Sequence, residues 1–196
     1  MIKAFLFDIG NVIVDFDFSR AGQALREHGC FPGDPIEATS DLRHALEIGA
    51  IDGDTFTTRA IARIGFEGSH DDFVACYQDI FTPNTRMWSL IEQLAEKFPL
   101  YLLSNTSDLH HAGLLRDFPV FQAFQSGVFS YRAKSLKPDS RIFATALREL
   151  PIEAESTLYF DDLPDNIAAG KRHGLISCQY DSATHTECLS FLAEMT

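Results

Sequence analysis

The first seventeen residues, MIKAFLFDIGNVIVDFD, constrain the fold more strongly than any other stretch. Five of the six residues from Ile2 to Phe7 are apolar, and this run contains neither Gly nor Pro. A short unbroken apolar run is typical of a strand buried on both faces, as in the middle of a parallel sheet. The run stops at Asp8, and Gly10 and Asn11 follow, both of which tolerate tight backbone conformations. A carboxylate at the carboxyl end of a central strand lies where open α/β sheets bind ligands.

From residue 83 onward, helix patterns alternate with strand patterns. We expect strands at 99–105, 125–130, 156–162 and 175–180. We expect helices at 84–98, 106–118, 137–150, 165–174 and 186–195. Alternation of this kind is the signature of a doubly wound parallel sheet with right-handed crossovers. The sequence therefore predicts an α/β fold with a Rossmann-like core.

The segment between the first strand and residue 83 has a different pattern. It contains no convincing strand after residue 18, and we expect helices at 20–29, 41–48, 55–64 and 69–81. Asp54 and Ser69 are the expected N-caps and Gly65 is an expected C-cap. We interpret residues 16–82 as an inserted helical cap, and residues 1–15 and 83–196 as the core.

Composition and charge exclude several classes of function. The chain has 196 residues, 45% of them hydrophobic, and a formal net charge of −12. General binding to nucleic acid or to anionic membranes needs basic surface, so neither partner is expected. No apolar run approaches the roughly 20 residues of a membrane span. The four cysteines form no CxxC pair, which favours reduced thiols in a cytoplasmic protein over disulfides or a zinc site. The sequence gives no indication of the oligomeric state.

Polar residues of matching chemistry follow three of the expected strands. They are Asp8 after the first, Ser104 and Asn105 after the second, Asp161 and Asp162 after the fourth, with Lys137 beside an intervening helix start. Each alone reads more simply as a turn or a helix cap. Because parallel strands deliver their ends to one edge, these residues can converge. Carboxylates suit a hard cation, while a hydroxyl and an ammonium suit phosphate oxygens, so the set has the parts for phosphoryl transfer.

Four stretches carry a resemblance to a known family. FDIGNVIVD, LLSNT, LKPDSRIF and YFDDLPDNIAAG look like motifs one to four of the haloacid dehalogenase-like hydrolase superfamily. The insertion resembles the family's helical cap of the first type. Within the superfamily the chain is most similar to the bacterial α-D-glucose-1-phosphate phosphatase group, and it is also similar to the phosphatase domain of soluble epoxide hydrolases. The resemblance implies a Mg²⁺-dependent phosphatase acting on a small phosphorylated metabolite, with a sugar phosphate expected.

The resemblance also implies roles for individual residues. Asp8 is the implied nucleophile, forming an aspartyl-phosphate, and also a Mg²⁺ ligand. The carbonyl of Gly10 and the carboxylate of Asp162 are the other implied metal ligands.

A second group of residues is implied to hold the substrate and the loops. Ser104 and Asn105 are expected to bind the transferring phosphoryl group, and Lys137 to bridge the nucleophile and the phosphate as a catalytic residue. Asp161 and the side chain of Asn166 are expected to orient their loop.

One position departs from the family pattern. Most phosphatases of the superfamily carry a second Asp where this chain has Gly10, and that Asp protonates the leaving group. Loss of a general acid/base typically costs about 10²–10⁴ in rate. Three explanations stay open: a substrate with a good leaving group, a substitute such as a cap residue or a metal-positioned water, or loss of catalysis. Asp15 and Asp17 are near in sequence, but their positions in space are not predictable.

Two rival functions remain at this stage. A metal-independent haloacid dehalogenase also uses an Asp nucleophile, but the adjacent Asp161 and Asp162 would repel it without a cation. A non-catalytic protein that binds a phosphate ligand is the second rival, because Gly10 cannot donate a proton.

Other features favour structural roles. His110 and His111 are adjacent on an expected helix, where neighbours point about 100° apart, so we expect a solvated helix face and no shared metal. Several aromatic residues are expected to pack the cap and its hinge, with one or two lining a pocket. These are Phe16, Phe18, Phe56, Phe73 and Phe81.

Overall fold

A sheet of five parallel strands organises the computed structural model, which describes residues 1–195. The spatial order is β5 (Ser126–Phe129), β4 (Leu100–Ser104), β1 (Ala4–Phe7), β6 (Thr157–Asp161) and β7 (Ile176–Gln179). All four neighbouring pairs are parallel. The central place of β1 follows from its sequence, because every residue of the strand is buried. The expected doubly wound α/β fold is confirmed.

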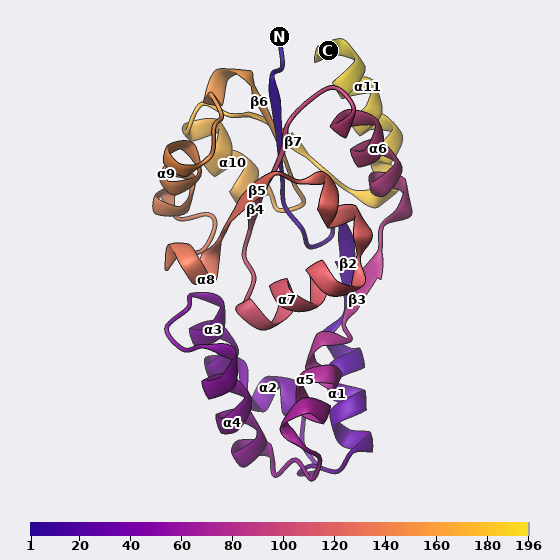
Figure 1. The fold of residues 1–196 in the computed structure, drawn as a ribbon, viewed down its shortest axis with the longest axis vertical. Helices are drawn as coiled ribbons and strands as arrows, with labels where there is room; N and C mark the ends of the chain where they lie inside the picture. The colour runs from indigo at the N-terminus through magenta and orange to yellow at the C-terminus, as the bar shows by residue number, and fades with distance from the viewer. Residues whose placement is uncertain (196) are drawn as a thin grey trace.

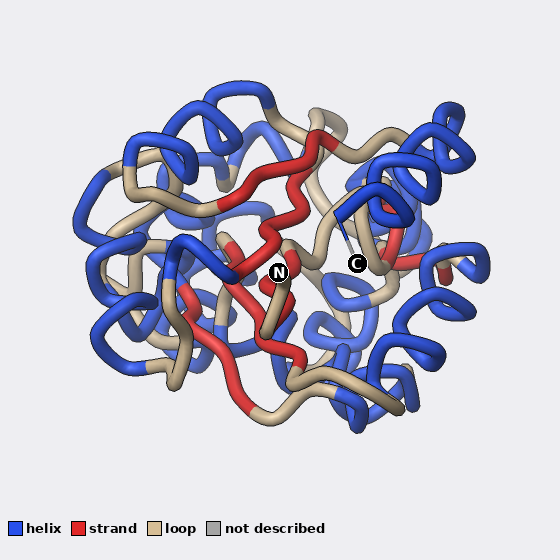
Figure 2. Tube along the Cα trace, turned by 90° about the horizontal axis from the view of Figure 1, so that it is seen from above, coloured by secondary structure: helices blue, strands red, loops and turns tan. Residues whose placement is uncertain are grey.

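Helices cover both faces of this sheet (Figures 1 and 2). On one face, α6 (Thr85–Ala95) and α11 (His185–Met195) contribute to an apolar cluster that includes Phe5 and Phe7. On the other face, α9 (Ser140–Glu149) and α10 (Pro164–Arg172) pack in a second cluster that includes Leu6. Alternate residues of β1 thus enter opposite layers, as the two-residue period of a strand requires.

The segment between β1 and α6 forms a separate helical unit. Its helices are α1 (Phe18–Glu27), α2 (Pro35–Ala38), α3 (Ser40–Glu47), α4 (Gly53–Ile64) and α5 (His70–Gln78). They enclose their own apolar cluster, in which Phe56 and Phe73 are almost fully buried. Figure 1 places these helices at the end of the molecule opposite both termini. A two-stranded antiparallel ribbon of β2 (Val14–Phe16) and β3 (Phe81–Pro83) joins them to the core.

The described residues form five further elements. They are α7 (Asp108–Asp117), α8 (Ser130–Ala133) and the 3₁₀ turns Pro119–Ala123, Ala154–Ser156 and Ser182–Thr184. The sequence did not predict β2 and β3, because each has three residues with largely exposed side chains and no alternation long enough to detect.

Two of the three helix caps expected above are confirmed. Ser69 caps α5 through a capping box, and Gly65 ends α4 with a φ of 62°, as expected. The expected cap of α4, Asp54, was wrong. Asp52 caps that helix by accepting from the Thr55 N–H, so α4 begins at Gly53. In the Asp-Gly-Asp sequence either carboxylate can cap, and the earlier one does.

All four cysteines are free thiols, as their spacing predicted. Across residues 1–195, every helix is too short or too polar to serve as a membrane span.

Candidate active site

The carboxyl ends of the three central strands meet at the edge of the sheet that faces the helical unit. Asp8 follows β1 directly, and its N–H donates to the Phe160 carbonyl of β6 at 2.9 Å. Ser104 is the last residue of β4, and Asp161 is the last of β6. One carboxylate oxygen from each of Asp8, Asp161 and Asp162 lies within 4.8 Å of the others. Residues about 150 positions apart along the chain are therefore neighbours at one site.

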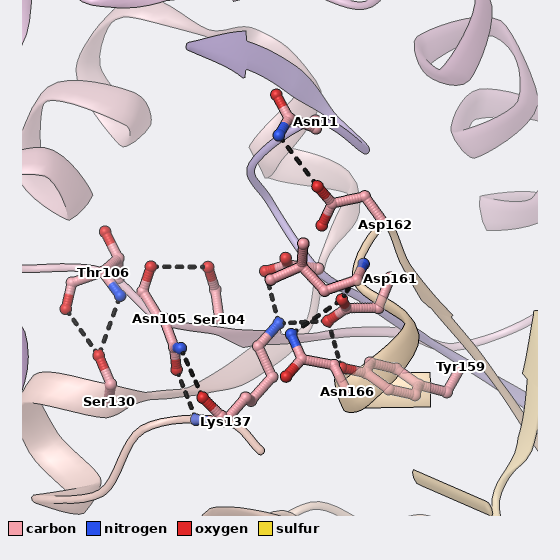
Figure 3. Close-up of polar contacts among 12 residues, drawn as sticks. Asn11, Ser104, Asn105, Thr106, Ser130, Lys137, Tyr159, Asp161, Asp162 and Asn166 are labelled. Atoms are coloured by element: carbon pink, nitrogen blue, oxygen red, sulfur yellow. Dashed lines mark hydrogen bonds and ion pairs between the residues drawn. The ribbon is translucent and has the colours of Figure 1, made fainter. Parts of the chain in front are cut away.

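Lys137 is buried between two of these carboxylates (Figure 3). Its Nζ lies 2.8 Å from Asp8 Oδ1 and 2.6 Å from Asp161 Oδ2. The side chain of Lys137 is only 1% exposed, so its charge depends on these partners. The loop before α9 thus delivers one ammonium to the centre of the acidic cluster.

Asp161 has every acceptor position occupied. Its Oδ2 accepts from Lys137 Nζ and from the Tyr159 hydroxyl. Its Oδ1 accepts at 2.9 Å from the Leu163 N–H and at 2.9 Å from the Asn166 side-chain amide. A carboxylate has about four lone-pair sites, so Asp161 has none left for a ligand. It holds Lys137 and the start of α10 in place.

Asp162 is less occupied and points toward the first loop. Its Oδ2 accepts from the Asn11 side-chain amide at 3.0 Å (Figure 3). Asn11 itself has a φ of 55°, a left-handed conformation that Asn adopts more readily than most residues. The tight turn after β1, which the Gly-Asn sequence predicted, directs this amide at Asp162.

The charges of this cluster are unbalanced among the described residues. Three carboxylates face one ammonium, that of Lys137. Burial, together with the charge of Asp161, raises the pKa of Asp8 to about 6, against the lowering effect of Lys137. Asp8 Oδ1 is also a buried oxygen without a properly directed hydrogen bond, although Lys137 Nζ is near. Hard carboxylate oxygens with excess negative charge fit a divalent cation such as Mg²⁺.

The backbone after β4 is tied to the backbone before α9. The Asn105 amide donates to the Lys137 carbonyl at 3.0 Å, and its oxygen accepts from the Lys137 N–H at 2.7 Å. The family resemblance assigns Asn105 to the phosphoryl group, and its side chain contacts the Lys137 backbone. The Ser104 hydroxyl has only a long 3.5 Å contact with the Asn105 carbonyl, so it is available for a ligand.

A small cavity of about 70 Å³ opens between this edge and the helical unit. It is lined by Ile9, Gly10, Phe16, Phe18, Glu47, Ile80, Phe81, Ser104, Asn105, Thr106, His110 and Leu114. Ser104 and Asn105 thus open onto the same space as residues of α1, α3, α7 and the β2–β3 ribbon. Of the expected aromatic residues, Phe16, Phe18 and Phe81 line the cavity, whereas Phe56 and Phe73 pack inside the helical unit.

The position of His110 corrects the sequence interpretation. It is 5% exposed, not on a solvated face, and its ring stacks on Tyr77 with centroids 4.6 Å apart. Its Nε2 lies 3.2 Å from the Tyr77 carbonyl. Burial lowers the pKa of His110 to about 4. The sequence pattern missed this because α7 packs against α5, a contact between distant helices that its own periodicity does not reveal.

Glu47 is a site residue that the sequence did not single out. It ends α3 and lines the cavity, and burial raises the pKa of its carboxyl. No motif marks it, because one Glu at the end of an amphipathic helix looks like a solvated charge.

Comparison with known proteins finds a family and several relatives that are similar to this chain. A model of the haloacid dehalogenase-like hydrolase family matches residues 2–174. The chain is 28% identical over 189 residues to a D-ribitol-5-phosphate phosphatase of Bacteroides thetaiotaomicron, covering 91% of this chain and 92% of that protein. It is 24% identical over 182 residues to a sesquiterpene phosphatase of Aspergillus oryzae, covering 89% of this chain and 87% of that protein.

A solved structure of this family has a similar fold. An enzyme of the same family from Bacteroides thetaiotaomicron, in complex with magnesium and inorganic phosphate, superposes with a TM-score of 0.83 at 25% identity. The match covers 93% of this chain and 96% of that one.

Proposed function

The chain belongs to the haloacid dehalogenase-like hydrolase family, and from that premise we propose that it is a Mg²⁺-dependent phosphatase acting on a small phosphorylated metabolite. The main observation that supports this proposal is the cluster of Asp8, Asp162 and Lys137 at the carboxyl edge of the sheet. A nucleophilic carboxylate, oxygen ligands for a cation and a fixed ammonium are the parts that phosphoryl transfer requires.

Asp8, the backbone carbonyl of Gly10 and Asp162 would hold the magnesium ion. Asp161 is not a ligand in this proposal, because four donors occupy its two oxygens. When bound, the cation neutralises charge on the phosphate and on the cluster. The excess of carboxylates over ammonium groups, and the buried Asp8 Oδ1 without a directed hydrogen bond, support this assignment.

The reaction is assigned to Asp8, whose carboxylate attacks phosphorus and forms an aspartyl-phosphate that water then hydrolyses. Lys137 keeps Asp8 fixed by the 2.8 Å ion pair and places a positive charge beside the transferring group. Ser104 donates its hydroxyl to a phosphoryl oxygen. Asn105 acts through its backbone on the phosphoryl group, and through its side chain it positions the Lys137 loop.

We assign residues 16–82 to a cap over the catalytic core formed by residues 1–15 and 83–196. The separate apolar cluster of the helical unit supports this division. The cavity between the two parts, about 70 Å³, favours a small substrate. A phosphorylated sugar or sugar alcohol is the proposed class, supported by the relative named as a D-ribitol-5-phosphate phosphatase.

The test is hydrolysis of p-nitrophenyl phosphate by the purified chain with Mg²⁺. Asp8→Asn and Asp162→Asn are expected to abolish phosphate release. Asp165→Asn is the matched control, because Asp165 is an exposed carboxylate in the first turn of α10, three positions after Asp162. A screen of phosphorylated sugars and sugar alcohols then identifies the substrate class.

The same assay separates the rival functions. Activity toward a haloacid that persists with EDTA would identify a metal-independent dehalogenase instead. Phosphate binding without turnover, equal in the wild type and Asp8→Asn, would identify a binding protein.

A further inference from the structure

The cavity lacks a proton donor at Gly10, and the Phe16 ring lies close to where a side chain at that position would begin. A Cβ at this position would lie 2.8 Å from Cε1 of the Phe16 ring. The aromatic ring of the β2–β3 ribbon therefore occupies the space that a side chain at position 10 would need. Any proton for the leaving group must come from another wall of the cavity.

Among the described residues that line this cavity, the titratable side chains are those of Glu47 and His110. His110 is unsuited to donate a proton. Its Nε2 contacts the Tyr77 carbonyl at 3.2 Å, and a carbonyl only accepts, so the proton of the neutral ring is on Nε2. Its Nδ1 is then without a proton, and burial keeps the pKa of the ring near 4.

Glu47 is better suited than His110 to donate a proton. Within residues 1–195, its carboxylate accepts no hydrogen bond and lies in no ion pair, although the residue is more than half buried. Burial raises its pKa, and Arg43 and His44 on the same helix lower it to a smaller extent. Tyr77 of α5 is a buried phenol without a hydrogen-bond partner, and its pKa is raised by burial and, to a smaller extent, by the charge of Glu47. A carboxyl in such surroundings retains a proton more readily than an exposed one.

The core holds the backbone of this part of the cap. The Ser130 hydroxyl lies 2.7 Å from the Glu47 carbonyl and accepts from the Thr106 N–H at 2.9 Å. The loop that follows is held as well, by Lys134 on the Gly49 carbonyl and by Asp108, which accepts from the Gly53 N–H at 2.9 Å. Glu47 is thus attached, through Ser130, to the segment directly after Ser104 and Asn105.

We propose that Glu47 is the general acid and base of the proposed phosphatase reaction, supplied by the cap in place of a side chain at position 10. This inference rests on the proposed function. As the bond from Asp8 to phosphorus forms and the bond to the leaving oxygen breaks, the Glu47 carboxyl gives its proton to that oxygen. The Glu47 carboxylate then takes a proton from water as the water oxygen attacks the aspartyl-phosphate. Phosphorus leaves Asp8, inorganic phosphate forms, and Asp8 and protonated Glu47 are regenerated.

The test compares two leaving groups in single-turnover experiments with Mg²⁺ that follow release of the leaving group, p-nitrophenol or glycerol, because hydrolysis of the aspartyl-phosphate is common to both substrates. p-Nitrophenolate is a stable anion and needs little protonation, whereas the alkoxide from glycerol 2-phosphate needs a proton as it leaves. Glu47→Gln is expected to lower the rate with glycerol 2-phosphate by about 10²–10⁴-fold. With p-nitrophenyl phosphate, the loss of rate is expected to be at least about 10²-fold smaller. Glu37→Gln is the control, since Glu37 is an exposed carboxylate on α2 of the same cap.

A second variant guards against a merely structural effect. In Glu47→Ala, sodium formate is expected to restore part of the rate with glycerol 2-phosphate, because a small carboxylic acid can enter the vacated space. Equal losses with both substrates, no loss in Glu47→Gln, or no rescue by formate would overturn the assignment of Glu47. A wild type that hydrolyses neither substrate would overturn the proposed function itself, and the assignment with it.

Discussion

The core wall and the cap wall, which are the sides of the site formed by the core and by the cap, hold their charged groups in different ways. On the core wall, Lys137 and Asp161 lie outside the lining of the cavity. They are fixed by ion pairs and by four hydrogen bonds to one carboxylate. On the cap wall, Glu47 is held through its backbone, and its carboxylate has no hydrogen-bond partner among residues 1–195. The core wall is therefore built to keep charges in one ionised arrangement. The cap wall is built to keep one carboxyl free to exchange a proton.

Lys137→Met, a substitution on the core wall, is expected to have the largest effect on the free energy of unfolding. It removes the only ammonium that pairs with Asp8 and Asp161 among the described residues, and leaves two buried carboxylates facing each other. Removal of one partner from a buried pair costs about 3–5 kcal/mol. Urea unfolding without added metal should show a loss of this size.

Lys97→Met is the control for this experiment, because Lys97 is exposed and has no ion pair in the described chain. Its free energy of unfolding should change by less than about 0.5 kcal/mol. A Lys137→Met protein as stable as this control would show that the acidic cluster does not depend on the ammonium.

The second effect concerns His110 and the pH dependence of stability. Its pKa is lowered from 6.5 to about 4 in the folded protein by burial, and the charge of Arg43 adds a smaller lowering. The unfolded chain therefore binds the proton first as the pH falls, and stability decreases between pH 6.5 and pH 4. At about 1.4 kcal/mol per pKa unit, the loss attributable to His110 is on the order of 3 kcal/mol.

The measurement compares the wild type with His110→Gln over that range of pH. The raised pKa of Asp8 acts with the opposite sign, because its folded form binds the proton first, but it is common to both proteins and cancels in the difference. A difference in free energy of unfolding that does not change with pH would contradict a neutral, buried His110.

A third, smaller effect is expected at the contact between the walls. Ser130→Ala leaves the buried Thr106 N–H without its acceptor at 2.9 Å, which costs about 1–3 kcal/mol. It also removes the hydroxyl that holds the Glu47 carbonyl. The ratio of the rates with glycerol 2-phosphate and p-nitrophenyl phosphate should then fall, although less than in Glu47→Gln. Ser140→Ala, on an exposed serine at the start of α9, is the control and should leave this ratio unchanged.

The same contrast explains what the sequence could predict. The strand ends were predictable because a buried parallel strand has a clear apolar pattern and its end has a fixed place on the sheet edge. Asp8, Ser104 and Asp161 could be located in this way without coordinates. The difference between Asp161 and Asp162 was available only from the family resemblance, and the hydrogen bonds that fill Asp161 give its physical reason.

The cap wall could not be predicted to the same degree. A helix can rotate about its axis and pack at several angles, so its pattern does not say which polar residue faces a distant loop. Glu47 enters the cavity because Ser130 and Asp108 hold the end of α3 and the start of α4, contacts between residues 55 or more positions apart. His110 was misassigned for the same reason, since its partner is on another helix.

The smallest effect is expected where the two walls touch, at Gly10 and Phe16. In Gly10→Ala the new Cβ would lie 2.8 Å from the Phe16 ring, so the ring must rotate away from its position. Phe16 is 42% exposed and has room to move, so the cost should be about 1 kcal/mol, near that of one strained side-chain torsion. In a Phe16→Ala background the same substitution should cost almost nothing, and a double-mutant cycle measures the difference as a coupling energy. A coupling energy near zero would show that Phe16 does not exclude a side chain at position 10. The absence of an acid there would then need a cause other than packing, and the role assigned to Glu47 would lose its structural premise.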